Sequence, residues 1–115
     1  MKMLEIKCAD DNGQRVIRLY GTISLASIPQ LTDALTRELR GTEANEVVVD
    51  VDGVDLLDDA GIGILMGFAA RVRSTNRGIV VVASIPRIAR RLEETHFDRA
   101  VDVAASIASI PRAPR

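Results

Sequence analysis

Residues 47–67, VVVDVDGVDLLDDAGIGILMG, decide the fold of this chain. The first five, Val47–Val51, form a β-branched run that is typical of a buried strand. We expect an Asp-rich loop from Asp52 to Asp59 and then a helix from Ala60 to about Asn76. Several carboxylates would then precede a helix N-terminus, where unpaired N–H groups bind an anion or a capping side chain. A small α/β domain often has its functional site at such a place.

The flanking segments predict the rest of the sheet. Leu4, Ile6 and Cys8 alternate with polar residues, and the turn sequence Asp11-Asn12-Gly13 joins them to a second strand, 16–20, which Gly21 ends. The remaining expected elements are a helix over 29–40, a strand over 79–83, a helix over 86–95, a short strand from Val101 and a short helix over 104–110. This order predicts an α/β fold. Its mixed sheet would begin with an antiparallel hairpin, continue with parallel strands and pack with about four helices. We expect one domain over residues 1–110 and a disordered tail over 111–115.

Composition excludes several classes of protein. The 115 residues include 15 basic and 16 acidic side chains, and this balance argues against a nucleic-acid binder. The single cysteine, Cys8, excludes an internal disulfide and fits a reducing, cytoplasmic location. We expect no membrane span, because no apolar run approaches about 18 residues. Neither Cys8 nor the lone His96 has ligand or triad spacing around it, so both are expected to be structural.

Charge is unevenly distributed along the chain. Acidic residues concentrate between Glu43 and Asp59, and arginines concentrate between Arg71 and Arg91. The simplest interpretation is a pair of solvated faces that offset each other. A sharper one is a dipolar surface that orients a protein partner.

Three motifs have the character of enzyme sites. Asp50-Val51-Asp52-Gly53 after a hydrophobic strand is similar to the start of a Mg²⁺-dependent phosphatase. That chemistry needs a later lysine, but no lysine follows Lys7. Gly61, Gly63 and Gly67 have nearly the spacing of a dinucleotide loop, although the third glycine comes one position late.

The third enzyme-like motif is a possible cation site. Asp55, Asp58 and Asp59 could bind a divalent cation, but no His or Glu is near them, and Asp58 or Asp59 is well placed as a helix N-cap. We therefore expect no catalytic residue, no metal site and no cofactor.

The predicted helix from Ala60 is apolar almost all round. Its apolar side chains are Ile62, Ile64, Leu65, Met66, Phe68, Ala69, Ala70 and Val72. A globular helix needs only one apolar stripe, so the surplus is either further core or a surface that docks a partner.

Nearly the whole chain resembles the STAS domains, in particular the bacterial anti-sigma factor antagonists. Three stretches carry the resemblance: Leu19–Ser24 running to Leu31; Val47–Asp50 with Gly53-Val54 and Leu57–Leu65; and Ile79–Ile88 with Leu92–Asp98. The second is similar to the family's hhhDhxxhxxhDSSGhxhL core, where h is apolar. The resemblance implies a non-enzymatic transcription regulator that binds a kinase-like anti-sigma factor and so releases a sigma factor.

The resemblance also implies where a partner docks. The expected surface consists of Thr22, Ser24, Asp58, Asp59, Ala60, Gly61 and Ile62. In this interpretation Asp58 and Asp59 supply charge and a cap, Gly61 lets the partner backbone approach, and Ile62 is a hydrophobic anchor. The family's kinase phosphorylates the second serine of the D-S-S-G loop. That position is Ala60 here, so the usual phosphate acceptor is lost.

Other functions stay open from the sequence. One is a structural STAS subunit of a larger complex, such as one for lipid transport or stress signalling. A nucleotide-binding module and a Mg²⁺-dependent phosphatase are the others. A homodimer is also possible.

Overall fold

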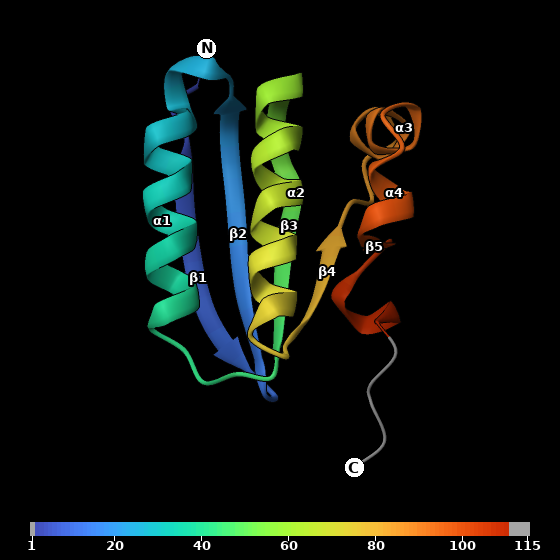
Figure 1. Cartoon of the computed structure of the whole chain (residues 1–115). Helices are drawn as coiled ribbons and strands as arrows, with labels where there is room; N and C mark the ends of the chain where they lie inside the picture. Colours follow the sequence, from blue (N-terminus) through green and yellow to red (C-terminus); the bar gives the residue numbers. More distant parts are fainter. Residues whose placement is uncertain (1, 111–115) are drawn as a thin grey trace.

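The computed structural model describes residues 2–110, which form a five-stranded mixed sheet with helices on one face and at one edge (Figure 1). The strands lie in the order in which they occur in the chain, β1 to β5. Strands β1 and β2 pair antiparallel, and every later neighbouring pair is parallel. The strands are β1 Glu5–Asp11, β2 Gln14–Ile23, β3 Glu46–Leu57, β4 Gly78–Val82 and β5 Asp102–Ala104. The helices are α1 Ile28–Arg40, α2 Asp59–Ser74, α3 Pro86–Glu94 and α4 Phe97–Ala100, with 3-10 turns η1 Leu25–Ser27 and η2 Ile107–Ser109. This arrangement confirms the predicted fold class.

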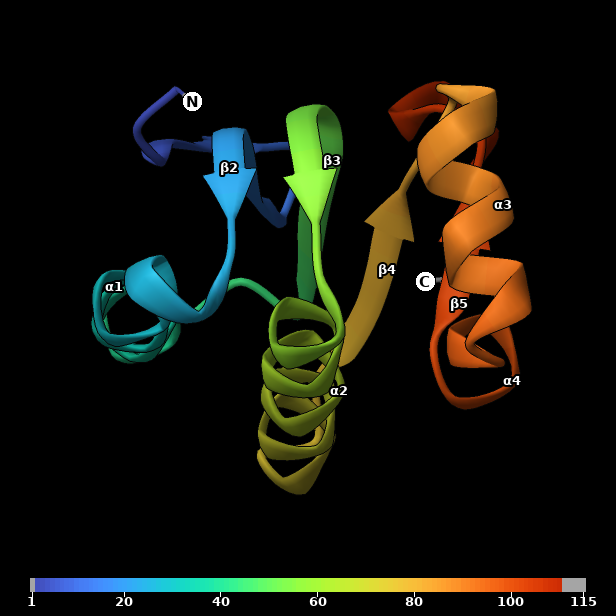
Figure 2. The same cartoon turned by 90° about the horizontal axis from the view of Figure 1, so that it is seen from above.

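The two faces of the sheet bury different amounts of apolar surface. Seen from above, α1 and α2 lie on one side of β2 and β3, and α3 and α4 lie beyond β4 (Figure 2). Val47, Val49 and Val51 of β3 belong to the large core under these helices. Val48 points to the other face, into a smaller cluster with Val16, Val80, Val82 and Ile110. Because β3 is buried on both faces, it reads as a continuous apolar run in the sequence.

The third strand is longer than predicted. The prediction of a loop from Asp52 to Asp59 is wrong, because β3 runs to Leu57 and pairs with the end of β2. The register between these strands shifts twice, between Arg18 and Tyr20 and between Gly21 and Thr22. A Cβ atom on Gly53 would lie 2.4 Å from Cδ1 of Tyr20, so the glycine lets the Tyr20 ring lie over the strand.

Gly21 does not end the second strand, contrary to the prediction. It lies inside β2 with φ +91°, and a Cβ atom there would lie 2.2 Å from the Met3 carbonyl oxygen. The next residue, Thr22, donates its N–H to the carbonyl of Lys2 over 3.1 Å. A bulge at a glycine therefore lets the N-terminal segment cross close to the strand.

The ends of the chain differ from the prediction in detail. The short last strand begins at Asp102, one residue after Val101. Of the helix expected over 104–110, only the 3-10 turn η2 forms. The predicted tail, 111–115, lies outside the described residues, so its disorder stays a prediction.

Candidate functional site

Asp58 connects three elements at one end of the sheet. Its Oδ1 accepts the Gly61 N–H over 3.0 Å, which caps α2, and its Oδ2 accepts the Leu25 N–H over 3.1 Å. Its own N–H donates to the Ile23 carbonyl over 3.1 Å. The predicted N-cap is confirmed at Asp58. One carboxylate thus fixes the start of α2 against the end of β2 and the turn η1.

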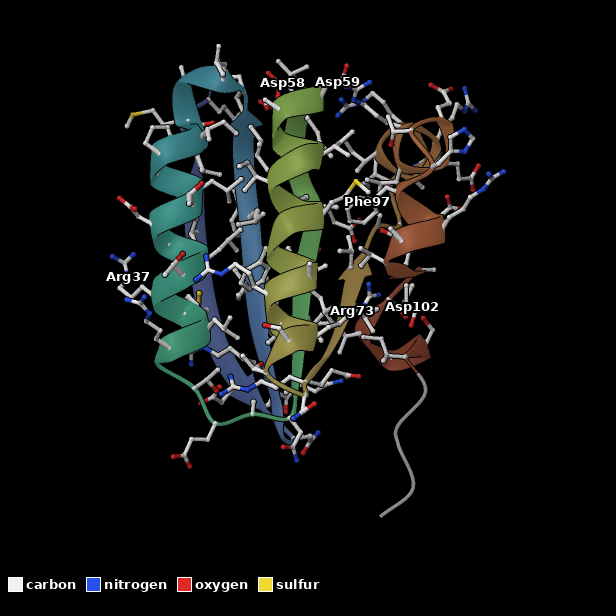
Figure 3. The ribbon with its side chains drawn as sticks, viewed as in Figure 1. Arg37, Asp58, Asp59, Arg73, Phe97 and Asp102 are labelled. Atoms are coloured by element: carbon white, nitrogen blue, oxygen red, sulfur yellow. The ribbon has the colours of Figure 1, made fainter. Side chains whose placement is uncertain are left out.

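The next residue, Asp59, is exposed to solvent, whereas Asp58 is half-buried. The Asp59 side chain is 88% exposed, and its Oδ1 accepts from Nη2 of Arg91 over 2.7 Å. The same arginine donates through Nε to the Leu57 carbonyl. Arg91 therefore joins α3 to the start of α2 across the sheet edge. In Figure 3, Asp58 and Asp59 lie together at the upper end of α2.

Thr22 and Ser24 lie beside this cap, on the end of β2 and the turn that follows it. Thr22 is buried, and its Oγ1 donates to Oδ1 of Asp55 over 3.0 Å. Ser24 is half-buried, and its N–H donates to Oγ of Ser27 over 3.0 Å. The structure thus brings Thr22 and Ser24 to the same end of the sheet as Asp58.

Gly61 and Ile62 are buried, which corrects the roles predicted for them. Ile62 is only 4% exposed and belongs to the main apolar cluster, so it cannot be an exposed anchor in this conformation. A Cβ atom on Gly61 would lie 2.4 Å from Cγ2 of Ile23, so this glycine lets α2 approach the sheet rather than a partner. Ala60, between Asp59 and Gly61, is half-buried.

Exposed apolar side chains at this end of the sheet were not predicted from the sequence. Leu25 is 76% exposed, Leu56 is 45% exposed and Ile85 is 39% exposed. Leu25 follows β2, Leu56 lies at the end of β3, and Ile85 follows β4. The carboxyl ends of these three strands lie at the same edge of the sheet because the strands are parallel. An isolated leucine in a predicted connection, such as Leu25, was the available signal. We call the surface formed by Leu25, Leu56, Asp58, Asp59, Ile85 and Arg91 the Asp58 end.

The carboxylates of the phosphatase-like motif have structural partners. Asp52 accepts from the N–H and Oγ of Ser84, over 2.6 and 2.8 Å, and so holds the connection between β4 and α3. Oδ2 of Asp50 lies 3.6 Å from Nε of Arg18, and Oδ1 of Asp50 accepts the N–H of Asp52 over 2.9 Å. Among residues 2–110, no group of three or more His, Cys, Asp or Glu side chains is arranged to hold a metal ion.

The basic block of the sequence does not form one face. At the Asp58 end, Arg91 donates to the Leu57 carbonyl of β3 and Arg87 donates to the Asp55 carbonyl of the same strand. Arg71 and Arg77 lie at the far end of α2, where Arg77 donates to the Leu39 carbonyl over 3.2 Å. Within the part of the chain described, no helix is both long and apolar enough to cross a bilayer.

Comparison with known proteins connects this geometry to a family. The family model described as the STAS domain matches residues 4–110. An anti-sigma factor antagonist from Mycobacterium paratuberculosis superposes with a TM-score of 0.77 at 20% identity, over 92% of this chain and 89% of that one. A STAS-domain protein from Planctomyces limnophilus has a TM-score of 0.74 at 16% identity, over 93% and 94%. The phosphorylated form of the Bacillus cell fate determinant SpoIIAA has a TM-score of 0.65 at 11% identity, over 93% and 96%.

Proposed function

The chain belongs to the STAS-domain family, and from that premise we propose that it is a non-enzymatic regulator of the anti-sigma factor antagonist type. It acts in the cytoplasm by docking a kinase-like anti-sigma factor, and the Asp58 end is the docking surface. Structural neighbours whose names describe them as anti-sigma factor antagonists support this class of function.

One observation carries the proposal: the Asp58 end combines a fixed backbone with exposed apolar side chains and charge. The two hydrogen bonds that the Asp58 carboxylate accepts hold the start of α2 and the turn η1 in one arrangement. Around them, Leu25, Leu56 and Ile85 offer apolar contact area. A protein interface typically has an apolar centre with a polar rim, and the Asp59–Arg91 pair supplies such a rim.

The predicted site residues then divide into two roles. Asp59 and Ala60 contact the partner at the start of α2, with Ser24 beside them. Thr22, Gly61 and Ile62 are buried, so they shape the surface from behind.

Ala60 changes how such a surface is controlled. It has no hydroxyl group, so a kinase cannot place phosphate at the usual position. Phosphate there would add about −1.5 to −2 charge beside Asp59. Docking at this surface is therefore not switched by phosphorylation of residue 60, and Asp59 contributes a constant negative charge.

The experiment compares two charge reversals with the same formal change. Asp59→Lys reverses the charge inside the proposed surface, whereas Asp98→Lys reverses it in the first turn of α4, at a residue that does not belong to the Asp58 end. Because mismatched charges at an interface cost several kcal/mol, Asp59→Lys should weaken partner binding more than about tenfold. Asp98→Lys should change it less than about twofold. Both variants should stay folded, because a cation near a helix N-terminus costs only about 0.3–1 kcal/mol.

The partner is recovered by affinity capture from the source bacterium, identified by mass spectrometry and purified for calorimetry. Recovery of a histidine-kinase-like ATPase with anti-sigma activity supports the proposal. Recovery of transporter or stress-complex subunits instead would favour the structural role. If Asp59→Lys melts and binds like the unchanged protein, the docking surface is elsewhere. Light scattering on the same samples measures whether the chain alone forms a homodimer.

A further inference from the structure

The C-terminal ends of α1 and α2 form a basic surface, at the end of these two helices that lies opposite the Asp58 end. Arg37 and Arg40 lie in the last turn of α1, Arg71 lies in the last turn of α2, and Arg77 lies just before β4. We call these four residues the arginine end. Figure 3 shows Arg37 toward the lower end of α1, while Asp58 and Asp59 lie at the upper end of α2.

Two adjoining recesses open at the arginine end and share Arg40. The first has a volume of about 560 Å³ and is lined by Asp33, Thr36, Arg37, Arg40 and Gly41. The second has a volume of about 410 Å³ and is lined by Leu39, Arg40, Arg71, Ser74, Thr75 and Arg77. Asp33 is the only carboxylate among these lining residues.

The four guanidinium groups use few of their donors within the protein. Arg71 donates through Nη1 to Oγ1 of Thr36 over 3.0 Å, and Arg77 donates to the Leu39 carbonyl. None of the ion pairs within residues 2–110 includes any of the four. Since each guanidinium carries five N–H donors, most of these donors are available to a ligand.

Helix dipoles account for the positions of Arg37, Arg40 and Arg71 but not for the number of arginines. A helix C-terminus carries about half a negative charge and attracts cations to its last turn. Two such ends, the Asp33 carboxylate and the Glu38 carboxylate, which attracts Arg37 electrostatically, offset only part of four full positive charges. The arginine end is therefore left with excess positive charge facing solvent.

The lining also indicates which anion fits. Leu39 is the one large apolar residue among the lining residues, and it is only 8% exposed, so the apolar centre of a protein interface is missing. None of the described residues that line the two recesses is aromatic, so a nucleobase would have nothing to stack on. The planar guanidinium fork matches phosphate oxygens in a bidentate manner. The Thr36 hydroxyl accepts from Arg71, so its own O–H can donate to a phosphate oxygen, whereas the hydroxyls of Ser74 and Thr75 donate to the carbonyls of Arg71 and Val72.

We propose that the arginine end binds an oligophosphate group through its phosphates alone, with Arg40 shared between phosphates seated in the two recesses. The group could come from inorganic polyphosphate or from the phosphate tail of a nucleotide. This proposal does not depend on the anti-sigma docking surface, which lies at the other end of α2. Failure of one therefore leaves the other unaffected.

The first test compares ligands by isothermal titration calorimetry at low ionic strength without Mg²⁺. Tripolyphosphate and ATP should bind within about threefold of each other, and adenosine should not bind, because only phosphates are contacted. Inorganic monophosphate should bind at least about tenfold more weakly than tripolyphosphate, because it can occupy one recess only. Much tighter binding of ATP than of tripolyphosphate would overturn the proposal, as would equal binding of a polyglutamate peptide.

The second test compares two arginines that carry the same charge. Arg40→Gln should weaken tripolyphosphate binding by at least about tenfold, because Arg40 contributes to both recesses. Arg90→Gln removes an exposed arginine on α3 that has no described ion pair, and it should weaken binding less than about twofold. Arg40→Lys, which keeps the charge but loses the fork, should fall between them. Equal losses in Arg40→Gln and Arg90→Gln would mean that only net charge attracts the anion, and would overturn the proposal. Thermal melts of each variant verify that the fold is intact.

Discussion

The two ends of α2 use charge in opposite ways. At the Asp58 end, the charged groups are largely engaged within the protein: the backbone N–H groups of Leu25 and Gly61, for example, donate to the Asp58 carboxylate. Large apolar side chains at this end are exposed. At the arginine end, the guanidinium groups have few internal partners, and little apolar surface is exposed. Engaged charges organise a rigid surface that suits a protein, whereas free charges suit a small anion. We propose that α2 presents two kinds of binding surface, because its neighbours differ at its two ends.

The largest expected effect comes from breaking the close packing at the Asp58 end. Gly61→Ala should lower the free energy of unfolding by about 1–3 kcal/mol, because the added Cβ atom would overlap Ile23 and Leu57. Gly63→Ala is the matched control in the same helix, since a Cβ atom there meets nothing within 4 Å. It should raise the free energy of unfolding by about 0.5–1 kcal/mol, because alanine favours the helix. Urea denaturation measures both, and equal effects would contradict the close approach of α2 to the sheet.

A smaller effect separates the two neighbouring aspartates. Asp58→Ala should destabilise the protein by about 1–2 kcal/mol, because it removes the cap of α2 and leaves the Leu25 N–H without its partner. Asp59→Ala should cost no more than about 1 kcal/mol, since its exposed pair with Arg91 is screened by water. Thermal melts of the two variants side by side decide the point. A larger loss for Asp59→Ala would reverse the roles assigned to these residues.

The smallest expected effect concerns Arg15, which pairs with the Glu38 carboxylate of α1. Arg15 donates through Nε to Oε1 of Glu38 over 3.0 Å. Burial alone would raise the pKa of Glu38, but hydrogen bonds from Cys8 and Arg15 outweigh it and lower the pKa below its ordinary value of 4.5. A lowered carboxyl pKa stabilises the fold above the ordinary value, and this stability is lost as the pH falls through the lowered pKa.

We therefore expect the unchanged protein to lose up to about 1 kcal/mol through this pair as the pH falls from about 5 to about 3. Glu38→Gln should lack this part of the acid sensitivity. Asp33→Asn, which removes a carboxylate of α1 that has no described ion pair, should keep it. Urea denaturation across this pH range measures the difference, and parallel curves for Glu38→Gln and the unchanged protein would exclude the contribution.

Local patterns made much of the fold predictable. The turn Asp11-Asn12-Gly13 is confirmed, with Asn12 at φ +51° and Gly13 at φ +80°. The cap at Asp58 and the order of the elements are confirmed as well. The predicted length of β3 was too short because aspartates and glycines usually mark loops. Here Asp52 and Asp55 are held by Ser84 and Thr22, and a glycine occupies the irregular register opposite Tyr20.

The sequence by itself determined the order of the main strands and helices, the turn at Asn12-Gly13 and the cap at Asp58, because periodicity, turn chemistry and capping act between residues a few positions apart. Only the tertiary structure decided that Ile62 is buried and that Leu25 is exposed, since both are apolar residues near the same cap. It also decided that Asp59 pairs with Arg91, 32 positions later in the chain. Such pairings depend on how parallel strands bring their carboxyl ends to one edge, and no local pattern encodes that distance.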